Sequence, residues 1–90
     1  PPEDVLCYLS DDLLELRNTW QASKLRQLIR QIAVEVERTW ELTTYCLDNE
    51  TFRDTLQGGL DATQIIEAFA AAGSPLPSKI QATLHDWQAK

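Results

Sequence analysis

Residues 58–77, GGLDATQIIEAFAAAGSPLP, hold all three glycines and two of the four prolines of the chain, and they constrain its fold more than any other stretch. The double glycine supplies the left-handed backbone geometry that ends a helix. Asp61 with Gln64 three residues later is a capping-box pattern that begins the next helix. Gly73 closes that helix, and the two prolines suit the first turn of a further one. The stretch therefore predicts a corner where three short helices meet.

The N-terminal half favours strands. Val5–Leu9 and Leu13–Arg17 are rich in apolar, strand-compatible residues and flank a polar turn at Ser10–Asp12, which predicts a β-hairpin. Trp40–Asp48 is dominated by alternating β-branched and aromatic residues, so it predicts a third short strand. After it, Asp48 or Asn49 is placed to cap the first of the three C-terminal helices.

Between the hairpin and the third strand, apolar residues recur in steps of three and four, which is typical of one helix face. The members of this stripe are Leu25, Leu28, Ile29, Ile32, Ala33 and Val36. The pattern predicts one long helix that begins near the capping residues Asn18, Thr19 and Ser23 and covers the hairpin.

These elements predict an α+β fold in a single domain of residues 1–90. An N-terminal β-hairpin and a third short strand are covered by one long helix, and a cluster of three short C-terminal helices follows. The hydrophobic fraction of 43% supports one modest core, with Trp20, Trp40 and Trp87 as its large candidates. Because the chain begins Pro-Pro-Glu without an initiating Met, we interpret it as a fragment of a larger protein.

Charge and cysteine usage narrow the function. The net charge of −6 argues against a strong, autonomous grip on DNA and favours protein partners. The spacing of Cys7 and Cys46 matches no zinc or redox motif, so we expect a reduced pair and a cytoplasmic location. No apolar run is long enough to span a bilayer, so no membrane partner is expected.

Catalytic signals are weak. The single histidine, His85, occupies a polar position of the last predicted helix, and a Ser-His-Asp arrangement would need it as the base. The sequence holds no His/Cys cluster, no EF-hand loop and no glycine-rich dinucleotide loop. We therefore predict no enzyme, no metal and no cofactor, and only a pair of carboxylates converging in three dimensions stays open as an alternative.

One segment departs from the acidic trend. Between Arg17 and Val34 there are four cations and no acid. The cations are Arg17, Lys24, Arg26 and Arg30, and Trp20 lies among them. They form either a small phosphate-contact patch with a stacking aromatic or, as the simpler and favoured interpretation, a solvated helix face with Trp20 in the core.

An ordered set of structural residues runs from the third strand to the last helix. Its members are Tyr45, Leu47, Asp48, Phe52, Leu56, Gly59, Leu60, Ile65, Phe69 and Pro75-Leu76-Pro77. This set resembles the accessory domain that lies N-terminal to the motor in XPB-type superfamily-2 DNA helicases and also occurs in bacterial proteins. The chain departs from that pattern at Asp48, where the family usually has Thr, and in a slightly shorter link from Phe69 to Pro75.

The resemblance implies an accessory role in DNA repair or transcription. These ninety residues contain no Gly-x-x-x-x-Gly-Lys-Ser/Thr loop for ATP, so ATP hydrolysis would belong to another part of the full protein or to another protein. Such a domain docks a protein partner or an adjoining helicase domain, or positions DNA beside the motor. We expect a partner surface on the last two helices around Ala71, Leu76 and Ile80. The alternative is a direct, weak DNA-backbone-binding module that uses the Arg17–Arg30 basic patch.

Overall fold

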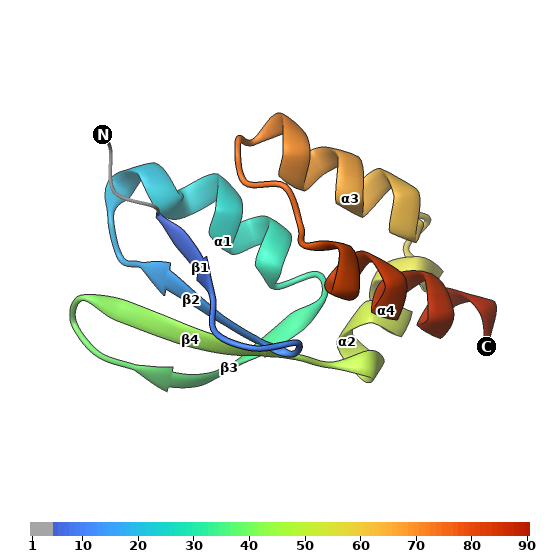
Figure 1. The fold of residues 1–90 in the computed structure, drawn as a ribbon, viewed down its shortest axis with the longest axis horizontal. Coiled ribbons are helices and arrows are strands. Elements are labelled where there is room, and N and C mark those ends of the chain that lie inside the picture. The colour runs from blue at the N-terminus through green and yellow to red at the C-terminus, as the bar shows by residue number, and fades with distance from the viewer. Residues whose placement is uncertain (1–4) are drawn as a thin grey trace.

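The structure, a computed structural model, describes residues 5–90, in which one antiparallel sheet carries all the helices on one face (Figure 1). The elements in chain order are β1 (Leu6–Tyr8), β2 (Leu13–Arg17), the 3₁₀ turn η1 (Trp20–Ala22), α1 (Ser23–Ile29), β3 (Ala33–Arg38), β4 (Leu42–Leu47), α2 (Asn49–Gln57), α3 (Ala62–Ala71) and α4 (Ser78–Ala89). This arrangement confirms the predicted α+β class. Within residues 5–90, no helix has the length and apolar character needed to cross a membrane.

The sheet has four strands in the order β1-β2-β4-β3, and every neighbouring pair is antiparallel. The predicted hairpin is confirmed, with Leu6 opposite Leu16. Burial alternates along β2 and β4, since Leu14, Leu16, Tyr45 and Leu47 are buried beneath the helices while the residues between them are only half-buried. One face of the sheet thus packs on the core, and no element of residues 5–90 covers the other (Figure 1).

The long helix predicted between the hairpin and the third strand is wrong. Helix α1 ends at Ile29, two tight turns follow, and residues 33–38 form strand β3 paired with β4. The apolar spacing resembles that of one helix because Ile32 and Ala33 are buried in the same core as α1. Ile32, however, belongs to the turn, and Ala33 begins the strand. Further along, Val34 and Val36 are exposed, and β-branched residues of this kind favour a strand.

Two of the three tryptophans do not lie in the core. The side chains of Trp20 and Trp40 are 84% and 86% exposed, because they occupy η1 and the tight turn between β3 and β4. Only Trp87 packs inward, with its ring 6.0 Å from that of Phe52 between centroids. The structure therefore corrects the expectation that Trp20 and Trp40 are core residues.

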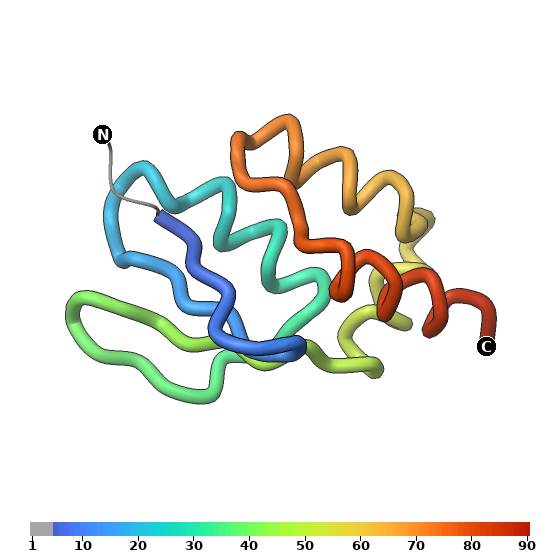
Figure 2. The backbone as a smooth tube through the Cα atoms, viewed as in Figure 1, coloured from blue at the N-terminus to red at the C-terminus, as the bar shows by residue number. Residues whose placement is uncertain are grey.

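Helices α2 and α3 begin and end where capping predicts, whereas α4 begins at Ser78, after both prolines, with Pro77 at its N-cap position and no side-chain cap. Asp48 accepts the Thr51 backbone N–H at the start of α2, and Asp61 forms a capping box with Gln64 at the start of α3. Gly59 and Gly73 adopt positive φ values of 104° and 87° just after α2 and α3. Figure 2 shows the resulting path, with η1 and the β3–β4 turn at one end and the C-terminus at the other.

Candidate nucleic-acid interface

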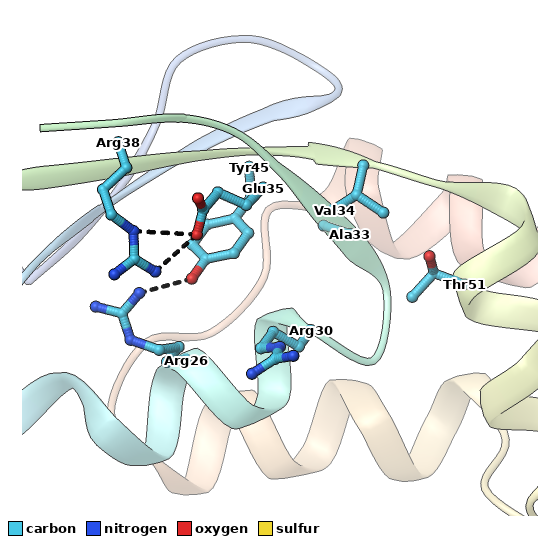
Figure 3. Close-up of a pocket in the computed structure, with 8 residues that line it drawn as sticks. All are labelled: Arg26, Arg30, Ala33, Val34, Glu35, Arg38, Tyr45 and Thr51. Carbon is cyan, nitrogen blue, oxygen red and sulfur yellow. Dashed lines mark hydrogen bonds and ion pairs between the residues drawn. The ribbon is translucent and has the colours of Figure 1, made fainter.

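A cavity of about 400 Å³ opens between helix α1 and the edge of the sheet (Figure 3). Its lining consists of Arg26, Arg30, Ala33, Val34, Glu35, Arg38, Tyr45 and Thr51. Helix α1 supplies Arg26, and its C-cap residue is Arg30. Strand β3 supplies the third arginine and the glutamate, and β4 supplies the tyrosine. The lining thus holds three arginines and one carboxylate, and Figure 3 shows Arg26 and Arg38 beside Glu35 and Tyr45, with Arg30 further along at the end of α1.

Arg26 is half-buried and held by neutral groups. Its guanidinium donates to the Tyr45 hydroxyl at 2.8 Å, to the Asn18 side-chain oxygen at 2.8 Å and to the Thr43 hydroxyl at 3.4 Å. In the part of the chain that the structure describes, no carboxylate pairs with Arg26 or with the exposed Arg30. The positive charge of Arg26 is therefore fixed in place without being neutralised.

Arg38 differs from the other two, because it faces Glu35 across 2.7 Å. The hydrogen bonds that Arg38 donates to the Glu35 carboxylate raise the pKa of Arg38 further above its ordinary value. Since this pair is internally balanced, the three arginines and one glutamate of the lining leave two cations in excess. An anion entering the cavity would meet Arg26 and Arg30 as its open charges.

Asn18 connects the cavity to the nearby end of the sheet. Its side-chain oxygen accepts hydrogen bonds from Arg26 and from the buried Thr43, the latter at 2.6 Å. Its side-chain amide donates to the Thr39 carbonyl at 2.9 Å, and its backbone N–H donates to the Glu41 carbonyl at 2.8 Å. This one residue therefore fixes both an arginine of the cavity and the turn between β3 and β4.

The structure brings together some residues of the predicted basic patch and separates others. Arg26 and Arg30 line the cavity, whereas Lys24 is exposed on α1 outside it. Arg17 lies half-buried on the uncovered face of the sheet, because it alternates with the buried Leu14 and Leu16 along β2. Trp20 is exposed at the start of η1, two residues after Asn18.

Sequence reasoning missed Arg38 and Tyr45 as cavity residues and Trp40 as an exposed aromatic. Arg38 was missed because residues 33–38 were interpreted as helix, which places its side chain incorrectly. The signal was present in Val34-Glu35-Val36-Glu37, where β-branched and charged residues alternate with the period of a strand. No local pattern indicates that Tyr45 receives a hydrogen bond from Arg26, nineteen residues away.

The partner surface predicted around Ala71, Leu76 and Ile80 is not an exposed apolar patch. Ala71 is exposed, but Leu76 and Ile80 are only 3% and 1% exposed, so they cannot form an apolar patch on the outside. They are buried because α4 turns its apolar face inward and the connection that precedes it follows the same core. The apolar spacing of this helix thus marks packing rather than docking.

A second cavity, of about 320 Å³, lies between the β1–β2 turn and the start of α4. Tyr8 lines it, and a surface pair between Lys79 and Asp11, 3.6 Å apart, spans its edge. Among residues 5–90, no three His, Cys, Asp or Glu side chains are grouped so as to hold a metal ion. This cavity offers no convergent charge comparable to that of the arginines.

Comparisons with known proteins find no match for the chain among protein-family models or curated proteins. The resemblance to the accessory domain of XPB-type helicases stays a prediction that rests on the residues of this sequence. The arginine cavity is therefore the structural feature that bears most directly on function.

Proposed function

We propose that this chain is a non-enzymatic accessory module that positions nucleic acid beside a motor, as its resemblance to the XPB-type accessory domain implies. The observation that carries the proposal is the cavity in which Arg26 and Arg30 present guanidinium groups without a carboxylate partner among the described residues. Phosphate oxygens are the ligands that suit such groups, because a planar guanidinium donates to them in pairs.

The fixed geometry of Arg26 supports this function. Tyr45, Asn18 and Thr43 hold the guanidinium through neutral hydrogen bonds, so its position is set before a ligand arrives. A pre-organised arginine loses less side-chain entropy on binding than a free one. Arg30, exposed one helical turn further on, adds a second cation on the same side of the helix.

The net charge of −6 sets the strength of the contact. Few cations with many surrounding acids give weak binding to a phosphate backbone, and its salt slope is shallow because the slope scales with the number of phosphates contacted. Weak contact is compatible with an accessory module, because an adjoining motor supplies the main grip on the nucleic acid.

Protein docking, the other part of an accessory role, would use the uncovered face of the sheet. Leu13 and Leu42 are half-buried there and Val34 is exposed, so apolar surface is available opposite the helices. This surface suits a protein partner or an adjoining helicase domain.

Both cysteines are free, which supports a reducing compartment such as the cytoplasm.

The test of nucleic-acid positioning is the salt dependence of oligonucleotide binding. The Arg26→Gln/Arg30→Gln variant should bind a short fluorescent DNA more weakly than the parent protein at low salt. The slope of log K against log salt should fall by roughly 1 for each phosphate contact removed. Arg30→Gln alone should give about half of that change without disturbing the Arg26 hydrogen bonds.

Arg53→Gln provides the matched control. Arg53 is an exposed arginine of α2 that bonds Asn49 and lies outside the cavity, so its loss changes the net charge equally and should leave the slope unchanged. Equal slopes for Arg30→Gln and Arg53→Gln would contradict a role for the cavity. If the parent protein binds no DNA at low salt, positioning of nucleic acid is ruled out and protein docking is the remaining function.

A further inference from the structure

Two tryptophans stand out on the surface at one end of the molecule. Trp20 and Trp40 are 84% and 86% exposed, although a large aromatic side chain is highly buried in most folded proteins. Neither ring has a stacking partner within residues 5–90, where Phe52 and Trp87 form the aromatic contact. Exposed indole faces of this size are free to receive another flat molecule.

The two tryptophans lie on segments that are hydrogen-bonded to each other through Asn18. Trp20 lies two residues after Asn18, and Trp40 lies between Thr39 and Glu41, the two residues whose carbonyl oxygens accept hydrogen bonds from Asn18. Figure 2 shows η1 and the β3–β4 turn at the same end of the chain path. The two indoles are therefore carried by segments that Asn18 ties together.

The same asparagine links this end to the arginine cavity. Its side-chain oxygen accepts from Arg26 at 2.8 Å, so the tryptophan-bearing segments and the open cation belong to one hydrogen-bonded unit. Single strands are bound by this combination, in which cations follow the phosphates and aromatic rings stack on bases that are not paired. A duplex presents its phosphates but keeps its base faces covered.

We infer that Trp20 and Trp40 form a stacking platform for the unpaired bases of a single-stranded nucleic acid whose backbone phosphate occupies the arginine cavity. This inference rests on the proposed function and specifies its ligand. The arginines supply the part of binding that depends on salt, and the indoles supply the preference for a single strand over a duplex.

The test compares binding of a short oligothymidylate with binding of a duplex of the same length. In Trp20→Ala/Trp40→Ala, affinity for oligothymidylate should fall by at least about fivefold for each tryptophan that stacks, since each stacked base contributes about 1–3 kcal/mol. Affinity for the duplex should change by less than about twofold. The remaining Trp87, packed on Phe52, reports by its fluorescence that the variant is folded.

A second measurement uses the intrinsic fluorescence directly. In Trp87→Phe the emission comes only from the two exposed indoles, and oligothymidylate should quench it, because a stacked base is in contact with the ring. The duplex should quench it far less at equal occupancy.

These experiments distinguish failure of the stacking platform from failure of the proposed function. If the double tryptophan variant binds oligothymidylate as the parent does, or loses single strand and duplex equally, the stacking platform is overturned. In that case the salt-dependent loss in Arg26→Gln/Arg30→Gln still supports the proposed function. If the parent protein binds neither ligand at low salt, the proposed function and the platform both fail.

Discussion

Tyr8 joins the first strand to the helical layer through a single side chain. Its hydroxyl lies 3.5 Å from the carbonyl oxygens of Ser74 and Pro75, in the connection between α3 and α4. Burial raises the pKa of Tyr8 from 10.0 to about 12, because the phenolate would lose its hydration there. The folded state therefore favours the neutral phenol.

This shift predicts an alkaline loss of stability. The folded-state pKa is above the unfolded value, so the stabilisation is complete below pH 10 and is lost as pH rises from 10 towards 12. The free energy of unfolding of the parent protein should fall relative to that of Tyr8→Phe over this window, as measured by urea titration at each pH. A difference between the two proteins that stays constant across the window would contradict the prediction.

Asn18 illustrates what a sequence shows of a single residue and what it does not. Its type and position suggested a helix cap, which is a local role. In the structure it bonds Arg26, Thr43 and Thr39, which are 8, 25 and 21 residues away. The cations of the site could be found from composition, but the neutral groups that hold them depend on strand register, which residue types alone do not determine.

At the scale of elements, local signals predicted the C-terminal half well and the middle poorly. Helices α2 and α3 have an acidic residue at the N-cap, and each is followed by a glycine with positive φ. Strand β3 has no such marks and is formed by pairing with β4, a contact that sequence spacing does not reveal. Because residues 33–38 were predicted as helix, Arg38 was not expected to line a cavity beside α1.

The adjacent glycines after α2 provide a matched test of helix termination. Gly59 has φ of 104°, so Gly59→Ala should lower the free energy of unfolding by about 1–2 kcal/mol through backbone strain. Gly58 has φ of −77°, and a Cβ there would meet the Thr55 carbonyl oxygen at 3.4 Å, an ordinary contact. Gly58→Ala should therefore cost little, and equal losses in urea unfolding followed by circular dichroism would refute this account of α2 termination.

At the scale of the whole molecule, one core joins the sheet to the C-terminal helices. Leu14 of β2, Phe52 of α2 and Leu84 of α4 are all fully buried in the same cluster. Since no layer has a separate core, we expect the sheet and the helices to unfold together.

Leu84→Ala tests this expectation. It should cost about 2–5 kcal/mol, the usual range for a buried leucine, and the far-ultraviolet circular dichroism and tryptophan fluorescence transitions should still coincide. His85→Ala, at the exposed neighbouring position, should stay within about 0.5 kcal/mol of the parent. Two separated transitions in Leu84→Ala would show that α4 folds independently of the sheet.

The irregularity in β3 between Glu35 and Glu37 has a consequence for solutions of many molecules. Strand β3 lies at an edge of the sheet, where a straight, apolar strand would invite a second copy to pair along it and begin aggregation. The bulge twists this edge, and the charges of Glu35, Glu37 and Arg38 oppose a neighbouring strand. Strand β3 also forms a wall of the arginine cavity. The bulge and charges that discourage self-association therefore also keep this wall open to a ligand.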